Sequence, residues 1–87
     1  MSSKYNLEFS SQSRRFLKKI KEKKFLTYIL EACEKIRENP YSGKFLQGVI
    51  KGYHSYRIGD YRIIYKIFHD RILIFVEDIA HRKESYH

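Results

Sequence analysis

The first residues of the chain alternate between apolar and polar side chains. Over residues 4–9, polar residues separate three apolar ones, Tyr5, Leu7 and Phe9. This period of two is typical of a β-strand with one buried face. Ser10 and Ser11 follow, and a serine hydroxyl can accept a hydrogen bond from the first turn of a helix. The pattern predicts a strand over residues 4–9 and a helix that begins at about Ser11.

The next two segments follow a helical period. In residues 11–21 and 24–39, apolar side chains recur every three or four positions, which places them on one face of a helix. In the first segment they are Phe16, Leu17 and Ile20. In the second they are Leu26, Ile29, Leu30, Cys33 and Ile36. Pro40 ends the second helix, because the residue before a proline avoids the helical conformation, and we expect a loop over residues 41–44.

Three further strands are predicted in the second half of the chain, over residues 53–58, 61–68 and 71–78. The connections Gly59-Asp60 and His69-Asp70 are short enough to join antiparallel neighbours. The order of elements indicates an α+β fold in which a four-stranded sheet carries two helices on one face. A chain of 87 residues has room for one domain, which we expect to span residues 1–87.

The middle strand of this meander separates two kinds of side chain. One face carries Tyr61, Ile63, Tyr65 and Ile67. The other face carries Arg62, Ile64 and Lys66. Because the first set is the more apolar, we expect it to face the helices and Arg62 to lie on the open face of the sheet.

The net charge of the chain indicates which class of partner it binds. The net charge is +8, which attracts polyanions such as nucleic acid, an acidic protein or an anionic membrane surface. The single cysteine, Cys33, cannot form an internal disulfide and is predicted to be a buried apolar residue. No apolar run approaches the roughly 20 residues of a membrane span, and the first residues lack a secretory signal. We therefore expect a cytoplasmic protein.

Two motifs resemble those of a known family. They are GYHSYRIGDYRIIY over residues 52–65 and AHRKESY over residues 80–86, separated by an apolar strand. With the length, the basic charge and the helical hairpin, they resemble the RelE/ParE superfamily of toxins from type II toxin–antitoxin systems. Within it, the chain is most similar to the RelE-like ribosome-dependent mRNA endonucleases.

The resemblance implies cleavage of mRNA in the ribosomal A site by attack of a ribose 2′-OH on the adjacent phosphate. This reaction needs a base for the 2′-OH proton, cations for the charge that grows on the phosphate, and an acid for the departing 5′ oxygen. By similarity, Arg62 and Arg82 contact the reacting phosphate, Tyr86 stacks on a base, and Arg57 is a further basic position. Arginine suits the phosphate because it stays charged and binds two oxygens at once.

The sequence departs from the family at the expected base. Tyr53 and Ser55 stand where the best-studied RelE toxin has lysines. His81 and His87 replace them as candidates, since histidine titrates near neutral pH. His54 is less suitable, because strand alternation places it on the face opposite Arg57.

A wider set of residues is expected to bind RNA without reacting. The set comprises Lys51, His54, Lys83, Arg14, Arg15, Lys18 and Lys19. Solvated charge is the alternative for the four residues of the first helix, and cross-strand pairing with Glu77 or Asp78 is the alternative for Arg57 and Arg62. No cofactor is expected, and the histidines have no companions at the spacing of a metal site.

Three functions remain open. The first is the endonuclease, with the ribosome and mRNA as partners and an acidic, RelB-like antitoxin that covers the site; operator DNA would be bound only through the toxin–antitoxin complex. The second is a ParE-like inhibitor of DNA gyrase on the same fold. The third is an RNA-binding or ribosome-binding module without chemistry, for which the basic charge suffices.

Overall fold

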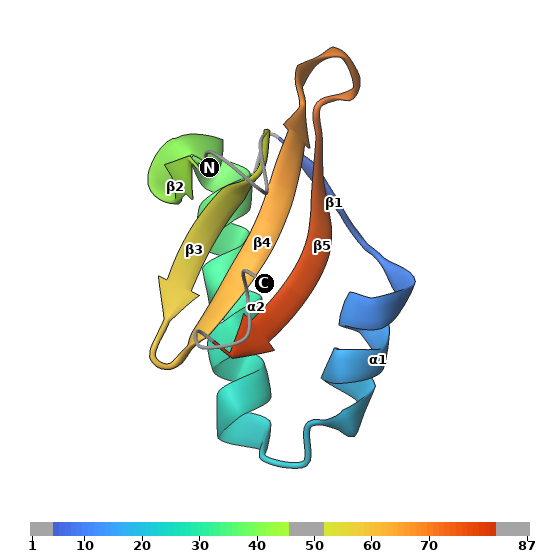
Figure 1. Cartoon of the computed structure of the whole chain (residues 1–87), viewed down its shortest axis with the longest axis vertical. Helices are drawn as coiled ribbons and strands as arrows, with labels where there is room; N and C mark the ends of the chain where they lie inside the picture. Colours follow the sequence, from blue (N-terminus) through green and yellow to red (C-terminus); the bar gives the residue numbers. More distant parts are fainter. Residues whose placement is uncertain (1–4, 46–51, 82–87) are drawn as a thin grey trace.

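The computed structural model describes residues 5–45 and 52–81, which form a mixed sheet and two helices (Figure 1). The helices are α1 (Ser11–Lys19) and α2 (Lys23–Glu38). The strands are β1 (Asn6–Phe9), β2 (Lys44–Phe45), β3 (His54–Ile58), β4 (Tyr61–Phe68) and β5 (Leu73–His81). Short 3-10 turns over Pro40–Ser42 and His69–Arg71 complete the described elements. Neither helix in these residues is long and apolar enough to cross a membrane.

The strands form one sheet in the order β1-β5-β4-β3-β2. Strand β1 runs parallel to β5, and the other neighbours are antiparallel. The α+β class and the helical hairpin are as predicted, but the prediction of four strands was wrong. Strand β2 was missed because two residues, Lys44 and Phe45, are too few to show a period. β1 can run parallel to β5 because the helices intervene in the chain between it and the rest of the sheet.

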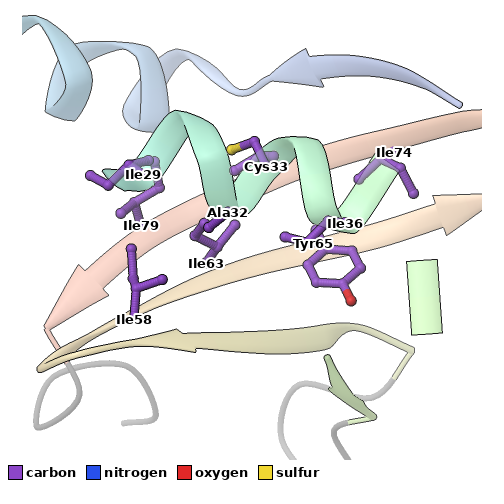
Figure 2. Packing of buried hydrophobic residues seen from close by; sticks show 10 residues of the cluster. Ile29, Ala32, Cys33, Ile36, Ile58, Ile63, Tyr65, Ile74 and Ile79 are labelled. Carbon is purple, nitrogen blue, oxygen red and sulfur yellow. The ribbon is translucent and has the colours of Figure 1, made fainter. Parts of the chain in front are cut away.

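Helix α2 covers one face of the sheet and provides one side of the core (Figure 1). Ile29, Ala32, Cys33 and Ile36 project from it toward the sheet (Figure 2). Facing them are six buried residues of the strands, Ile58, Ile63, Tyr65, Ile74, Val76 and Ile79. The expectation for Cys33 is confirmed, since the residue is 1% exposed, and burial raises the pKa of its thiol to about 12.

The predicted face of the middle strand is also confirmed. Ile63 and Tyr65 of β4 lie in the core, and Tyr61 and Ile67 pack against it. The prediction that Leu30 lies on the buried face of α2 was wrong, because Leu30 is 43% exposed. Since α2 turns about 100° per residue, a helix that centres Ile29, Cys33 and Ile36 on the sheet turns Leu30 toward solvent.

Two serines fasten the start of α1 to β5. They reach the part of β5 next to Glu77, where the register of β4 and β5 shifts between Ile64 and Tyr65. The hydroxyl of Ser10 donates to the carbonyl of Glu77 at 2.6 Å, and that of Ser13 donates to the carbonyl of Val76 at 3.1 Å. The Ser10 side chain also accepts from the Ser13 amide, as the sequence predicted for a cap.

The connection from β4 to β5 is longer than predicted. A tight turn was expected at His69-Asp70, but a 3-10 turn covers His69–Arg71 and Ile72 adopts φ 50 in the left-handed region. Strand β5 therefore begins at Leu73 and extends to His81, beyond the predicted end at residue 78. Gly59 has φ 60 in the β3–β4 turn, a conformation that glycine adopts without a steric penalty.

Candidate functional site

Two arginines lie next to each other on the face of the sheet away from α2. In the register of β3 and β4, Arg57 lies directly opposite Arg62. Tyr56 and Ile58, the strand neighbours of Arg57, pack toward the core, so Arg57 points to the open face. Arg57 is exposed and Arg62 is half-buried. The structure thus places Arg62, which was predicted to bind phosphate, on the same face as Arg57, the further basic position, in adjacent strands.

The direct neighbours of Arg62 across the sheet include no acid. On one side it faces Arg57, and on the other it faces Ala80 of β5. The register places neither Glu77 nor Asp78 directly opposite Arg57 or Arg62: Asp78 lies opposite Ile64, one step away along the same face, and Glu77 lies at the register shift. Pairing of an arginine with Asp78 from this diagonal position stays the alternative interpretation of the pair. Like charges in directly opposite positions destabilise a sheet, so an anion bound between the two guanidinium groups would relieve this repulsion.

Next to the arginine pair along β4, the residues of the open face are buried and uncharged. Beside the arginine pair lie Ser55 and Ile64, which face each other and are 6% and 3% exposed. Lys44 of β2 lies opposite Ser55 and is exposed, so β2 adds a cation to this face. No periodic pattern marks Lys44 as a strand residue, because β2 is two residues long.

His54 lies on the other face, as strand alternation predicted. Its ring stacks on Tyr65 at 5.4 Å between ring centroids, and Tyr41 and Phe45 contact its other sides edge-on. Burial, and secondarily the nearby charge of His69, lower the pKa of His54. With 7% of its surface exposed on the helix-facing side, His54 is not brought together with Arg57, and its role in RNA binding stays an untested prediction that this geometry does not favour.

His81 also lies away from the arginine pair. It faces Tyr61 across β4 and β5, and the two rings meet edge-on at 5.3 Å. Tyr61 in turn packs against Phe16 and Phe25 of the helices. Because Ala80, not His81, shares the open face with Arg62, the described structure does not place His81 where a base for this reaction would stand.

The remaining predicted residues fall into two groups. Arg14, Arg15, Lys18 and Lys19 are exposed on α1 and are not part of the open sheet face. Five lie outside the described residues, and their roles stay predictions: Lys51, Arg82, Lys83, Tyr86 and His87. Within residues 5–45 and 52–81, no group of three or more His, Cys, Asp or Glu side chains could hold a metal ion.

Comparisons with known proteins agree with this architecture. Residues 7–86 match the family model of the ParE toxin of type II toxin–antitoxin systems, parDE. No match was found among curated proteins.

Three solved structures have the same fold. A chain of the RelBE2 toxin–antitoxin complex from Mycobacterium tuberculosis is 26% identical, with a TM-score of 0.81 over 97% of this chain and 98% of that one. A chain of the RelE–RelB complex from Pyrococcus horikoshii is 20% identical, with a TM-score of 0.78 over 94% and 99%. A chain of the ParDE system of P. aeruginosa is 12% identical, with a TM-score of 0.72 over 90% and 96%. The family match over nearly the whole chain, on this fold, shows that the protein belongs to the RelE/ParE superfamily of type II toxin–antitoxin toxins.

Proposed function

We propose that this toxin is a ribosome-dependent endoribonuclease that cleaves mRNA in the ribosomal A site. The observation that carries the proposal is the direct opposition of Arg57 and Arg62 on the open sheet face. A phosphodiester is the anion that such a pair suits, because each guanidinium presents a planar fork of donors to two oxygens. The net charge of +8 favours approach to ribosomal RNA and mRNA.

The proposed reaction is a transesterification within the RNA. The 2′ oxygen of the upstream ribose attacks the adjacent phosphorus, the bond from phosphorus to the 5′ oxygen breaks, and the products carry a 2′,3′-cyclic phosphate and a 5′-hydroxyl. Arg57 and Arg62 would bind the non-bridging oxygens and neutralise the charge that grows on them in the transition state. A guanidinium group is not deprotonated in proteins, so an arginine pair serves as a pair of fixed cations.

Proton transfer is assigned to residues outside the described part of the chain. A base must take the 2′-OH proton, and an acid must protonate the 5′ oxygen. Of the two candidate histidines, His81 faces Tyr61 on the helix side, so His87 is the one that we propose for one of these steps. Arg82 is proposed as a further phosphate ligand and Tyr86 as the residue that stacks on a base.

The proposal includes an antitoxin partner. The M. tuberculosis and P. horikoshii relatives are chains of toxin–antitoxin complexes. We propose that an acidic antitoxin neutralises this chain by covering the open face, and that operator DNA is bound only through the resulting complex. Action on translating ribosomes implies a cytoplasmic location.

Inhibition of DNA gyrase is the second candidate function. It is favoured by the family match, which is to the ParE toxin, and by the likeness to the P. aeruginosa ParDE system. A ParE-like toxin acts by binding protein and needs no paired arginines at a phosphate. The arginine pair is therefore the feature that makes us prefer the endonuclease.

Two assays with the wild-type chain separate these functions. In a translation reaction, mRNA 5′ ends mapped by primer extension should show cuts within codons when ribosomes are present and none when they are absent. In a supercoiling assay, purified gyrase should keep its activity at the same toxin concentration. Intact mRNA together with inhibited gyrase would reverse the assignment.

A further inference from the structure

Basic and aromatic side chains also meet at the opposite end of the open face from the arginine pair. The ammonium group of Lys66 lies 5.6 Å from the centre of the Tyr53 ring and 5.4 Å from that of Phe68. The guanidinium of Arg71 lies 5.3 Å from the centre of the Phe68 ring. These distances are those of cation–π contacts, which hold each cation in a defined place.

Strand alternation places Lys66 and Phe68 on the face of Arg62, and Tyr53 and Arg71 contact these two residues. Lys66 follows Arg62 by four residues on β4, and Phe75 of β5 lies opposite Lys66. We call Tyr53, Lys66, Phe68, Arg71 and Phe75 the aromatic platform. Arg71 is exposed and the other four are half-buried, so parts of their surfaces are open to a ligand.

Charge on the open face is divided between its two sides. The cations lie on β2, β3 and β4, where Lys44, Arg57, Arg62 and Lys66 project. The acids lie on β1 and β5, where Glu8 faces Phe75 and Asp78 faces Ile64. Asp70 lies beside Arg71 in the turn. A polyanion would therefore follow β4 from the arginine pair to Lys66 and then reach Arg71, which lines a groove with Asn6 and Glu8 of β1.

We propose that the aromatic platform is a second contact site for the single-stranded RNA whose phosphate the arginine pair binds. Lys66 lies about 14 Å from Arg62 along an extended strand, a length that about four stacked nucleotides span. Lys66 and Arg71 contact phosphates of the flanking nucleotides, while the rings of Tyr53 and Phe75 and the planar guanidinium of Arg71 offer surfaces on which bases stack. This inference rests on the proposed function, because it takes RNA as the substrate.

The test measures RNA binding separately from cleavage. The probes are fluorescein-labelled single-stranded RNAs of about three and about eight nucleotides, methylated at the 2′ oxygen so that they cannot be cut. The variants are Lys66→Gln, Arg71→Gln and Tyr53→Leu in the full chain. The matched controls are Lys24→Gln and Tyr28→Leu, which change exposed residues of α2. Fluorescence anisotropy at several salt concentrations gives the affinity and its salt dependence.

We expect Tyr53→Leu to weaken binding of the longer RNA about tenfold and to leave the shorter RNA unaffected. Lys66→Gln and Arg71→Gln should each lower the slope of log affinity against log salt by about 0.7 for the longer RNA. Arg71 is exposed, so Arg71→Gln should fold normally. It therefore tests the proposal even if Tyr53→Leu or Lys66→Gln, which change half-buried residues, fails to fold. The controls should bind like wild type.

The proposal is overturned if Arg71→Gln and folded Tyr53→Leu bind the longer RNA like wild type, or if the α2 controls weaken it equally. Its failure is distinct from failure of the endonuclease. If wild type cleaves mRNA but the platform variants bind RNA as tightly as wild type, only the platform proposal is wrong. If wild type cleaves no mRNA but the platform variants bind the longer RNA more weakly, the platform proposal holds and the endonuclease proposal is wrong.

Discussion

Arg57 and Arg62 occupy directly opposite positions of β3 and β4, on the sheet face that α2 leaves open. Two cations in such positions repel each other, and the register brings no acid directly opposite Arg62 on its other side, where Ala80 lies. Opposed cations cost the folded sheet some stability, and a local rule broken in this way is typical of a functional site. A bound anion would offset the repulsion, and the phosphate of an RNA backbone is such an anion.

The cap of α1 should contribute measurably to stability. Ser10→Ala removes the bond from its hydroxyl to the Glu77 carbonyl and the bond that it accepts from the Ser13 amide. We expect the free energy of unfolding to fall by about 1 kcal/mol, as for other helix caps. Urea denaturation measures it, with Ser11→Ala as the control, because Ser11 is the exposed next residue. If Ser10→Ala and Ser11→Ala have the same free energy of unfolding, the hydrogen bonds of the Ser10 hydroxyl do not stabilise the protein.

Gly43 should be intolerant of any side chain. A Cβ there would lie 2.5 Å from Oη of Tyr65 and 2.9 Å from the carbonyl oxygen of Ser55. Tyr65 cannot easily withdraw, because its hydroxyl donates to the Pro40 carbonyl at 2.7 Å and accepts from the Gly43 amide at 3.1 Å. We expect Gly43→Ala to lower the free energy of unfolding by about 1–3 kcal/mol.

A double-mutant cycle tests the cause of this loss. Tyr65→Phe removes the crowding oxygen, so Gly43→Ala should cost less in that background, by at least about 0.5 kcal/mol. Some cost should remain, since the Ser55 carbonyl is still close. If the cost is the same in both backgrounds, the Tyr65 hydroxyl is not what excludes a side chain at residue 43.

His54 should make stability depend on pH. Burial lowers its pKa in the folded protein below the ordinary value near 6.5. The unfolded chain therefore takes up a proton at a pH where the folded chain resists it. Stability is full above about pH 6.5 and falls as the pH drops below it.

The variant His54→Phe keeps an aromatic ring among Tyr41, Phe45 and Tyr65 but cannot titrate. Free energies of unfolding from urea titrations at about pH 7.5 and about pH 5.5 should differ more for wild type than for this variant. A wild type that loses no more stability than the variant would contradict this assignment.

Much of the fold follows from the sequence because its signals are local. The period of two over β1 and β4, the helical stripe of Ile29, Cys33 and Ile36, and the serine cap of α1 each predict an element from a few residues. The open-face position of Arg62 and the opposite orientation of His54 both follow from alternation alone.

What the sequence did not predict depends on pairing between distant segments. Nothing local to Lys44 and Phe45 shows that they pair with Ser55 and His54 to form β2. The position of His81 could not be predicted, because the sequence did not show that β5 continues three residues beyond residue 78. This extension brings His81 opposite Tyr61, on the helix side of the sheet. The register that sets Arg57 against Arg62 likewise exists only in the paired strands.

The most direct test of the account is cleavage by Arg62→Ala. In a reaction with translating ribosomes, mRNA 5′ ends mapped by primer extension report the cleavage rate of wild type, Arg62→Ala, Arg57→Ala and the α2 control Lys24→Ala. The Arg57→Ala chain should be at least as stable as wild type, because it removes an exposed charge that faces another of the same sign.

We expect Arg62→Ala to lower the cleavage rate about 100-fold or more, as the loss of one donor to a transition-state oxyanion does, and Lys24→Ala to cleave like wild type. Arg62→Lys should recover part of the rate, since it restores the charge without the planar fork. A folded Arg62→Ala protein that cleaves A-site codons at the wild-type rate would contradict the claim that the arginine pair binds the reacting phosphate.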